Sequence, residues 1–318
     1  MAARRLALHA QALRGPPTNV SAAATATTSA PAVQFFASHD GEQIAYRTLG
    51  DRSDVAVILL HGYGGNGASW WSMGHPQRLV GLGFFVIALD LRGHGASAKP
   101  VTPSGWQDDA EMRDIIAIAD ELGLTRYLAA SQSHGSIELA KLLVSDDRLL
   151  AAVLGEYADG MTSAEHRQSW WYDTLAVQKE AEAEAAKTEE ERIAALALAQ
   201  LQRHQAITTP EEMAQVTIPV LVIHGSEDHY NGASCRGPTG QNAESAQGDF
   251  ARLASYFPLG ELAIVPGGHG AASNTPEFAQ HFDAFLLTHK PGKSALRLPR
   301  IFSDHMVQIT LSSIEPLF

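Results

Sequence analysis

The serine best placed to act as a nucleophile, Ser133, stands between an apolar run and a helical segment. The run Tyr127 to Gln132 predicts a strand, and the helix is expected to begin near Ile137. A serine in such a strand–turn–helix junction is held in a strained backbone conformation that exposes its hydroxyl group. The residues two before and two after it must be small, and they are Ser131 and Gly135. The segment therefore predicts a nucleophile elbow, which departs from Gly-x-Ser-x-Gly at its first position.

A serine hydroxyl needs a base to take its proton and a carboxylate to orient that base. His269 follows the last predicted strand in a glycine-rich loop and is the candidate base, and Asp228 follows the preceding strand and is the candidate acid. Glu156, which follows the sixth strand, is a second candidate acid. The ordinary alternatives are a turn-forming Asp, a solvated loop His, and a helix N-cap made by Ser133 or Ser136. The chain order and the strand-end positions favour a Ser-His-Asp triad.

Acyl transfer also needs donors for a negatively charged oxygen, and backbone amides commonly supply them. His61-Gly62-Tyr63 directly follows the third predicted strand, where the glycine lets the chain turn and the Tyr63 amide point inward. The second donor is expected to be the His134 amide, next to the nucleophile. The glycines at 64–67 could instead suggest a phosphate loop, but that segment lacks the Lys-Ser/Thr ending.

Short apolar runs alternate with helical segments over most of the chain, which predicts an α/β protein with a mostly parallel eight-stranded sheet flanked by helices. A helix is expected at Asp109–Leu122 and another around Phe278–Leu287. Residues 158–215 interrupt the alternation and predict an inserted helical cap, so the core comprises 33–157 and 216–289. The expected strands are Gln34–Ala37, Gln43–Thr48, Val55–Leu60, Phe84–Asp90, Tyr127–Gln132, Leu150–Gly155, Val220–His224 and Glu261–Val265.

Both ends of the chain lack this pattern. Residues 1–32 contain three arginines, no acidic residue and a Ser/Thr/Ala-rich run, which is typical of a disordered extension or of an organellar transit peptide. Residues 290–318 follow a helix-breaking Pro-Gly pair and are expected to form a C-terminal appendage. We expect a cytoplasmic protein, or an organellar one if the N-terminal extension is a targeting peptide.

Charge and cysteine content exclude several classes of function. The 23 basic and 35 acidic residues give a net charge of −12, which would repel nucleic-acid phosphates and anionic membranes. No apolar run approaches the roughly 20 residues that a transmembrane helix needs. The single Cys235 excludes an intrachain disulfide and a cysteine-based zinc site. We therefore expect a small-molecule substrate, with no nucleic-acid or membrane partner.

These motifs resemble those of the α/β-hydrolase superfamily, specifically its members with a helical cap, over about residues 34–289. The resemblance includes His61-Gly62-Tyr63, the segment from Asp90 to Ser97, the Ser133 elbow, Asp228 and His269. It implies an α/β-hydrolase fold, no metal and no organic cofactor, and structural roles for Arg92 and His94 in the loop after the fourth strand. A serine at position 133 argues against the haloalkane dehalogenases and epoxide hydrolases of this superfamily, whose nucleophile is a carboxylate.

The expected reaction is hydrolysis of a carboxylic ester, lactone or thioester through an acyl-enzyme. Trp70, Trp170 and Trp171 are candidates to line an apolar substrate pocket, with plain packing between cap and core as the alternative. Carbon–carbon bond hydrolysis and cofactor-free peroxidation would use the same triad. A cofactor-free dioxygenase is a further alternative, because such relatives also carry Ser-His-Gly at the elbow. The last alternative is a non-catalytic receptor or scaffold protein that binds a ligand in the pocket.

Overall fold

The computed structural model describes residues 29–157, 170–205, 207–228 and 243–292. Cys235 and most of the two predicted tails lie outside these ranges. Within them the strands and helices lie close to the positions that the sequence predicts. No helix in the described part of the chain is both long and apolar enough to cross a membrane.

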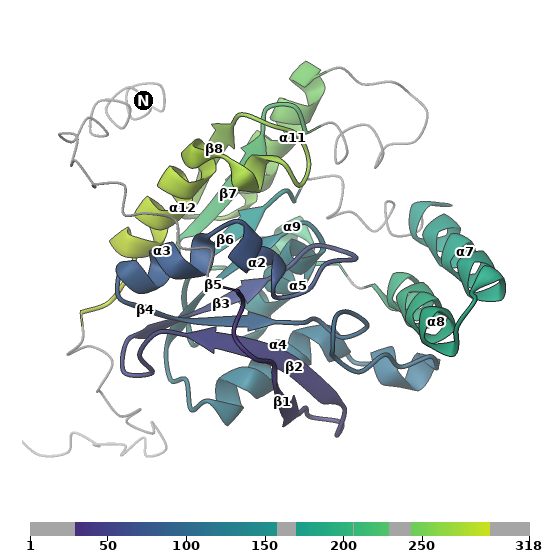
Figure 1. The fold of residues 1–318 in the computed structure, drawn as a ribbon. Coiled ribbons are helices and arrows are strands. Elements are labelled where there is room, and N and C mark those ends of the chain that lie inside the picture. Colours follow the sequence, from purple (N-terminus) through teal and green to yellow (C-terminus); the bar gives the residue numbers. More distant parts are fainter. Residues whose placement is uncertain (1–28, 158–169, 206, 229–242, 293–318) are drawn as a thin grey trace, which may run out of the picture.

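One eight-stranded sheet forms the centre of the molecule, in the order β1-β2-β4-β3-β5-β6-β7-β8 (Figure 1). The pairs β1–β2 and β2–β4 are antiparallel, and all other neighbours are parallel. The mostly parallel sheet predicted from the sequence is confirmed. The strands are β1 Gln34–Ala37, β2 Gln43–Leu49, β3 Val55–Leu60, β4 Phe84–Leu89, β5 Tyr127–Gln132, β6 Leu149–Gly155, β7 Val220–Gly225 and β8 Gly260–Val265.

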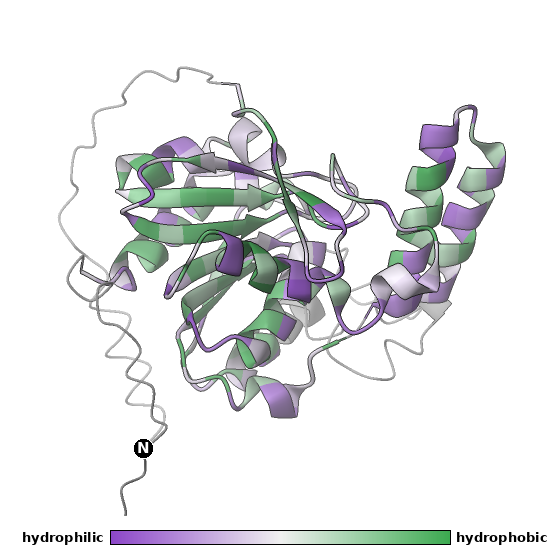
Figure 2. Cartoon of the chain, turned by 90° about the horizontal axis from the view of Figure 1, so that it is seen from below, coloured by the Kyte–Doolittle hydropathy of each residue, from purple (hydrophilic) through white to green (hydrophobic). Residues whose placement is uncertain are grey.

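Helices cover both faces of this sheet, which explains why the central strands β3 and β4 are apolar at every position. In β3, alternate side chains enter two different cores: Ala56, Ile58 and Leu60 pack on one face, and Val55, Val57 and Leu59 on the other. In Figure 2 the inner strands are hydrophobic for most of their length. The covering helices are α2 Ser69–Ser72, α3 His75–Gly81 and α12 Pro276–Thr288 on one face, and α4 Ala110–Glu121, α5 His134–Ser145, α9 Pro210–Met213 and α11 Ala243–Tyr256 on the other.

The predicted insertion contains a helical hairpin, α7 Trp170–Ala185 and α8 Glu189–His204, which projects from the body of the molecule (Figure 1). Helix α8 begins with a capping box between Thr188 and Glu191. Its alanine-rich inner face packs through Ala197 and Leu201 against Trp106, in the short 3-10 helix η1 Pro103–Trp106. The hairpin is therefore anchored on the loop that follows β4.

Two predicted boundaries need correction. Met213 and Val216 lie at the end of the predicted insertion and just beyond it, yet both pack in the main core, so the segment rejoins the core before residue 213. Lys290, placed by the prediction in the appendage, donates hydrogen bonds to the carbonyl oxygens of Leu82 (2.8 Å) and Gly83 (2.7 Å). Its ammonium group also lies 4.6 Å from the centre of the Phe84 ring.

Candidate active site

Ser133 occupies a sharp turn between β5 and α5, with φ 51° and ψ −116°. A non-glycine residue rarely adopts such a conformation, which costs on the order of 1–3 kcal/mol and persists only where the surrounding structure enforces it. The helix begins at His134, three residues earlier than predicted, because the elbow turns directly from strand to helix. A Cβ on Gly135 would lie 2.6 Å from the carbonyl oxygen of Leu60 and 2.7 Å from that of His61. Only glycine therefore lets the new helix pass this closely to β3.

The unusual Ser131 of the elbow is accommodated by hydrogen bonds. Its hydroxyl group is fully buried, donates to the carbonyl oxygen of Val153 at 2.9 Å and lies 2.9 Å from the hydroxyl of Ser136. Ser136 in turn donates to the carbonyl oxygen of Gly155 at 2.7 Å. Ser133 occupies the N-cap position of α5, but its side chain makes no capping hydrogen bond, and Ser136 lies inside the helix. The structure therefore does not support an ordinary side-chain N-cap as the role of either serine.

The structure brings Ser133, His269 and Asp228 into one hydrogen-bonded chain. His269 Nε2 lies 2.9 Å from Ser133 Oγ, and His269 Nδ1 lies 3.0 Å from Asp228 Oδ2. The three residues follow β5, β8 and β7, whose carboxyl ends meet at one edge of the sheet. The loops after β7 and β8 are closely packed, since a Cβ on Gly225 would be 2.1 Å from the carbonyl oxygen of Gly267. The predicted residues are thus placed together by close backbone packing.

The electrostatics of this chain favour proton transfer from the serine. Burial opposes charging of His269, but the hydrogen bond that it donates to Asp228 and the charges of Glu156 and Asp228 raise its pKa above the ordinary 6.5. Burial by itself would raise the pKa of Asp228, but His224 and His269 bring it well below its usual range. An ionised Asp228 accepts the Nδ1 proton of His269, so Nε2 carries the lone pair of the ring and lies within hydrogen-bond distance of Ser133 Oγ.

The predicted oxyanion loop lies against the nucleophile. A Cβ on Gly62 would lie 3.3 Å from Ser133 Cβ. The loop is held by His61, whose Nδ1 donates to the carbonyl oxygen of Gly62 at 2.8 Å and whose Nε2 accepts from the Leu91 amide at 2.9 Å. Burial lowers the pKa of His61 to about 4, so that ring remains neutral in this role. Tyr63 follows directly, with its ring 5.7 Å from that of His94.

The side chain of His134 has a role that the sequence analysis did not find. It is buried, with Nε2 3.1 Å from Glu111 Oε1 on α4. Burial opposes its protonation, but the charge and hydrogen bond of Glu111 raise its pKa above the ordinary value. The only signal in the sequence was the presence of Glu111 and Glu138 in two predicted helices. Acidic residues are common in helices, so this signal did not indicate a partner for His134. This ion pair ties the residue after the nucleophile to the neighbouring helix.

Two groups of described side chains have the spacing of metal ligands: His39, Asp40 and Asp114, and Glu111, His134 and Glu138. In each group a cationic side chain already pairs with a carboxylate. In the first group, Arg92 Nη2 lies 2.7 Å from Asp114 Oδ1. In the second group, Lys141 Nζ lies 2.7 Å from Glu138 Oε2. Both groups are therefore accounted for by ion pairs between side chains, of which the second is buried.

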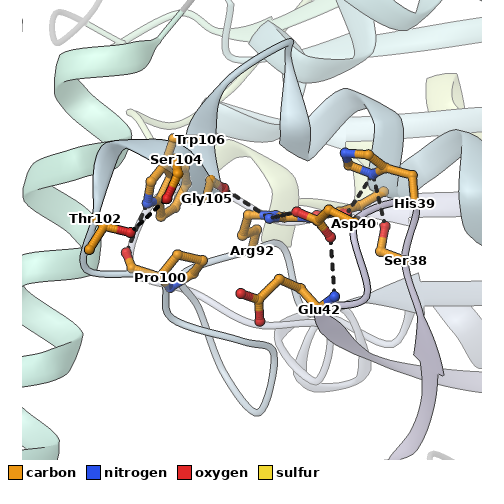
Figure 3. A network of polar contacts seen from close by, with 11 residues as sticks. Ser38, His39, Asp40, Glu42, Arg92, Pro100, Thr102, Ser104, Gly105 and Trp106 are labelled. Carbon is orange, nitrogen blue, oxygen red and sulfur yellow. Dashed lines mark hydrogen bonds and ion pairs between the residues drawn. The ribbon is translucent and has the colours of Figure 1, made fainter.

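Arg92, in the loop after β4, joins three other segments of the chain (Figure 3). Its fully buried guanidinium group donates to Asp114 on α4 and to both oxygens of Asp40 in the β1–β2 turn. It also donates to the carbonyl oxygen of Gly105 in η1 at 2.8 Å. This arrangement matches the structural role that the resemblance implied, because it holds the segment on which the helical hairpin rests.

Trp70 does not lie in a substrate pocket. Its side chain is fully buried in the core beneath α3 and α12, with its ring 6.2 Å from that of Phe282 and 5.4 Å from that of His75. The pocket prediction is corrected for this residue, whose role is packing. Trp170 and Trp171 begin α7, and their side chains lie outside the part of the chain that the structure describes.

Glu156, the second candidate acid, lies near His269 but does not take the place of Asp228. Its Oε1 accepts the backbone amide of Gly270 at 2.8 Å, directly after the histidine. Asp228 makes the contact with the imidazole Nδ1. The geometry thus favours Asp228 as the orienting acid.

Comparisons with known proteins agree with this fold. A family model described as the alpha/beta hydrolase fold matches residues 55–180. The dihydrolipoyllysine-residue acetyltransferase component of the acetoin cleaving system from Pseudomonas putida is 29% identical over 141 residues, covering 41% of this chain and 37% of that protein. Epoxide hydrolase 4 from Mus musculus is 31% identical over 97 residues, covering 30% of this chain and 26% of that protein. The chain therefore spans well under half the length of these curated relatives.

Among solved structures, the enol-lactonase from Burkholderia xenovorans has a TM-score of 0.61 with 20% identity, and the match covers 80% of this chain and 99% of that one. At 20% identity, this structural likeness shows a shared fold and nothing about the substrate. The family match over residues 55–180, the strand order and this structural likeness together show that the chain has the α/β-hydrolase fold.

Proposed function

We propose that this protein is a serine hydrolase that cleaves a carboxylic ester, or a related lactone or thioester, of a small and partly apolar substrate. The observation that carries the proposal is the continuous hydrogen-bonded chain from Asp228 through His269 to Ser133. A buried carboxylate, an imidazole and a half-buried serine hydroxyl, hydrogen-bonded in this order, form the machinery of acyl transfer.

In the first half of the reaction, Ser133 Oγ attacks the carbonyl carbon while its proton moves to His269 Nε2. The amides of Tyr63 and His134 are the proposed donors to the resulting oxyanion, and their preorganised dipoles stabilise charge that develops only in the transition state. His269 then gives its proton to the leaving oxygen or sulfur, and an acyl-enzyme remains on Ser133.

In the second half, a water molecule attacks the acyl carbon and His269 accepts the water proton. The tetrahedral intermediate collapses, the carboxylic acid leaves, and the proton returns to Ser133 Oγ. Asp228 remains ionised throughout and stabilises the imidazolium in both halves.

The comparisons support this class of reaction without specifying the substrate. The enol-lactonase that shares the fold acts, by its name, on a cyclic ester. Epoxide hydrolase 4 is named for a different reaction. Epoxide hydrolases of this superfamily are expected to open the epoxide with a carboxylate nucleophile, which forms an alkyl ester. The elbow of this protein carries the hydroxyl of Ser133 instead.

The test is labelling with a fluorophosphonate probe together with turnover of p-nitrophenyl esters of graded acyl length. We expect the wild-type protein to label, and Ser133→Ala to lose labelling and nearly all turnover while keeping its melting temperature. Ser72→Ala is the matched control, because Ser72 is an exposed serine on α2. Labelling that persists in Ser133→Ala would contradict the proposal.

A cofactor-free dioxygenase is the second candidate, because Ser133, His134 and Gly135 stand at the elbow and a buried carboxylate, Glu156, lies near the base. Oxygen uptake with quinolone-type compounds distinguishes the two functions. Oxygen consumption that is independent of Ser133, in the absence of ester turnover, would favour the dioxygenase.

A further inference from the structure

Glu156 adopts an unfavourable backbone conformation at the end of β6. Its φ is 56°, in the left-handed region that glycine and asparagine tolerate best, and its side chain is fully buried. The backbone amide donates to the carbonyl oxygen of Ile223 on β7 at 3.0 Å, which holds the residue in register with the neighbouring strand. A strained residue that is also a buried acid indicates that its side chain has a specific task.

That side chain contacts the loop of the proposed base. Glu156 Oε1 accepts the Gly270 amide at 2.8 Å, and Gly270 directly follows His269. Gly270 itself has φ 74°, so the chain turns sharply at this position. The hydrogen bond therefore sets the direction in which the loop presents the imidazole.

A second set of contacts joins the same loop to the nucleophile strand. Gln132, directly before Ser133, donates through Nε2 to Ser273 Oγ at 2.9 Å and also donates to the carboxylate of Glu156. Ser273 Oγ lies 3.3 Å from the carbonyl oxygen of Gly270. Glu156 is thus at the centre of a buried network that links the ends of β5 and β6 to the His269 loop.

The carboxylate also acts on the imidazole through its charge. Among the described residues, the titratable groups near His269 are Glu156, Asp228 and His224. Burial raises the pKa of Glu156, and the nearby His269 opposes that increase. The charge of Glu156 is in turn one of the causes of the raised pKa of His269, after the hydrogen bond that His269 donates to Asp228.

We propose that Glu156 is a positioning residue, which holds the His269 loop against the nucleophile elbow through the Gly270 amide and adds negative charge beside the imidazole. It does not touch the reacting atoms, and Asp228 alone orients the ring. This inference rests on the proposed serine-hydrolase function.

Two substitutions separate the hydrogen bond from the charge. Glu156→Gln keeps an acceptor oxygen for Gly270 and removes the charge, whereas Glu156→Leu removes both. In Glu156→Leu we expect kcat for the ester to fall about 10- to 100-fold with KM within about twofold, because a misplacement of about 1 Å can cost about 100-fold. In Glu156→Gln we expect kcat at its optimum within about threefold of wild type. In both, the acidic limb of the pH profile should move to lower pH, because loss of the negative charge lowers the pKa of His269.

Glu227→Gln is the matched control, because Glu227 is an exposed acid in the neighbouring loop whose backbone amide donates to Gly267 at 2.9 Å. It should change neither kcat nor the pH profile. Melting temperatures and active-site titration with the fluorophosphonate restrict the comparison to folded protein. Wild-type kcat in Glu156→Leu, or an unmoved acidic limb in Glu156→Gln, would overturn the inference. Absence of labelling in the wild type would instead contradict the proposed function, so the two failures are distinguishable.

Discussion

The substitution Asp228→Asn gives the most direct measure of the proposed triad, because the two side chains have nearly the same shape. The buried carboxylate lies 3.0 Å from His269 Nδ1, and its side chain has no exposure to solvent. With an effective dielectric constant of about 20, a charge pair at this distance interacts by about 5 to 6 kcal/mol. Since each 1.36 kcal/mol corresponds to about a tenfold change in rate, loss of the charge should lower kcat by about four powers of ten.

A second effect of Asp228→Asn acts in the same direction. If the amide NH2 group of the new side chain faces His269 Nδ1, the ring takes the tautomer with its proton on Nε2. That nitrogen then cannot accept the proton of Ser133. We expect the loss in kcat to exceed any change in KM, because the interaction strengthens when the imidazole becomes charged.

The assay is steady-state turnover of one ester by wild type, Asp228→Asn, Glu156→Gln and Asp283→Asn. Asp283 is a suitable control because it is an acid on α12 that pairs with Arg78 on α3 at 2.9 Å and makes no contact with the proposed triad. Its substitution should leave kcat unchanged. The assignment of Asp228 as the acid would be refuted if kcat fell less than about tenfold in Asp228→Asn. It would also be refuted if kcat fell further in Glu156→Gln than in Asp228→Asn.

Four further outcomes are expected. The rate of fluorophosphonate labelling should fall as the pH drops through the raised pKa of His269, with a midpoint above the ordinary 6.5, and a midpoint below that value would contradict the role of the adjacent carboxylates. Gly135→Ala should destabilise the fold by about 1 to 3 kcal/mol in urea unfolding, because the new Cβ meets backbone atoms at 2.6 Å, whereas Gly81→Ala, with open space around it, should not destabilise it. Arg92→Met should cost about 3 to 5 kcal/mol in the same measurement, because it leaves the buried carboxylate of Asp114 without its cation. A chain ending at residue 292 should melt like the full chain, whereas one that ends at 289 and lacks Lys290 should melt several degrees lower.

The amino-acid sequence determined the strands, their parallel arrangement and the residues of the proposed triad. It could do so because these features depend on local patterns: apolar runs such as β3 and β4 match their predicted positions within one residue, and small residues flank Ser133. His269 and Asp228 each follow a strand. The carboxyl ends of parallel strands share one edge of the sheet, so strand-end residues converge there.

Only the tertiary structure decided how the remaining polar residues are used. Trp70 packs in the core and Lys290 docks on the end of α3, since burial depends on neighbours that are far away in the sequence. Asp228 and Glu156 follow adjacent strands and are chemically alike, and only their distances show that one contacts the imidazole and the other the Gly270 amide. Sequence spacing places a side chain at an edge of the sheet, but the choice between two hydrogen-bond acceptors at that edge is made by loop packing, at distances of a few ångström.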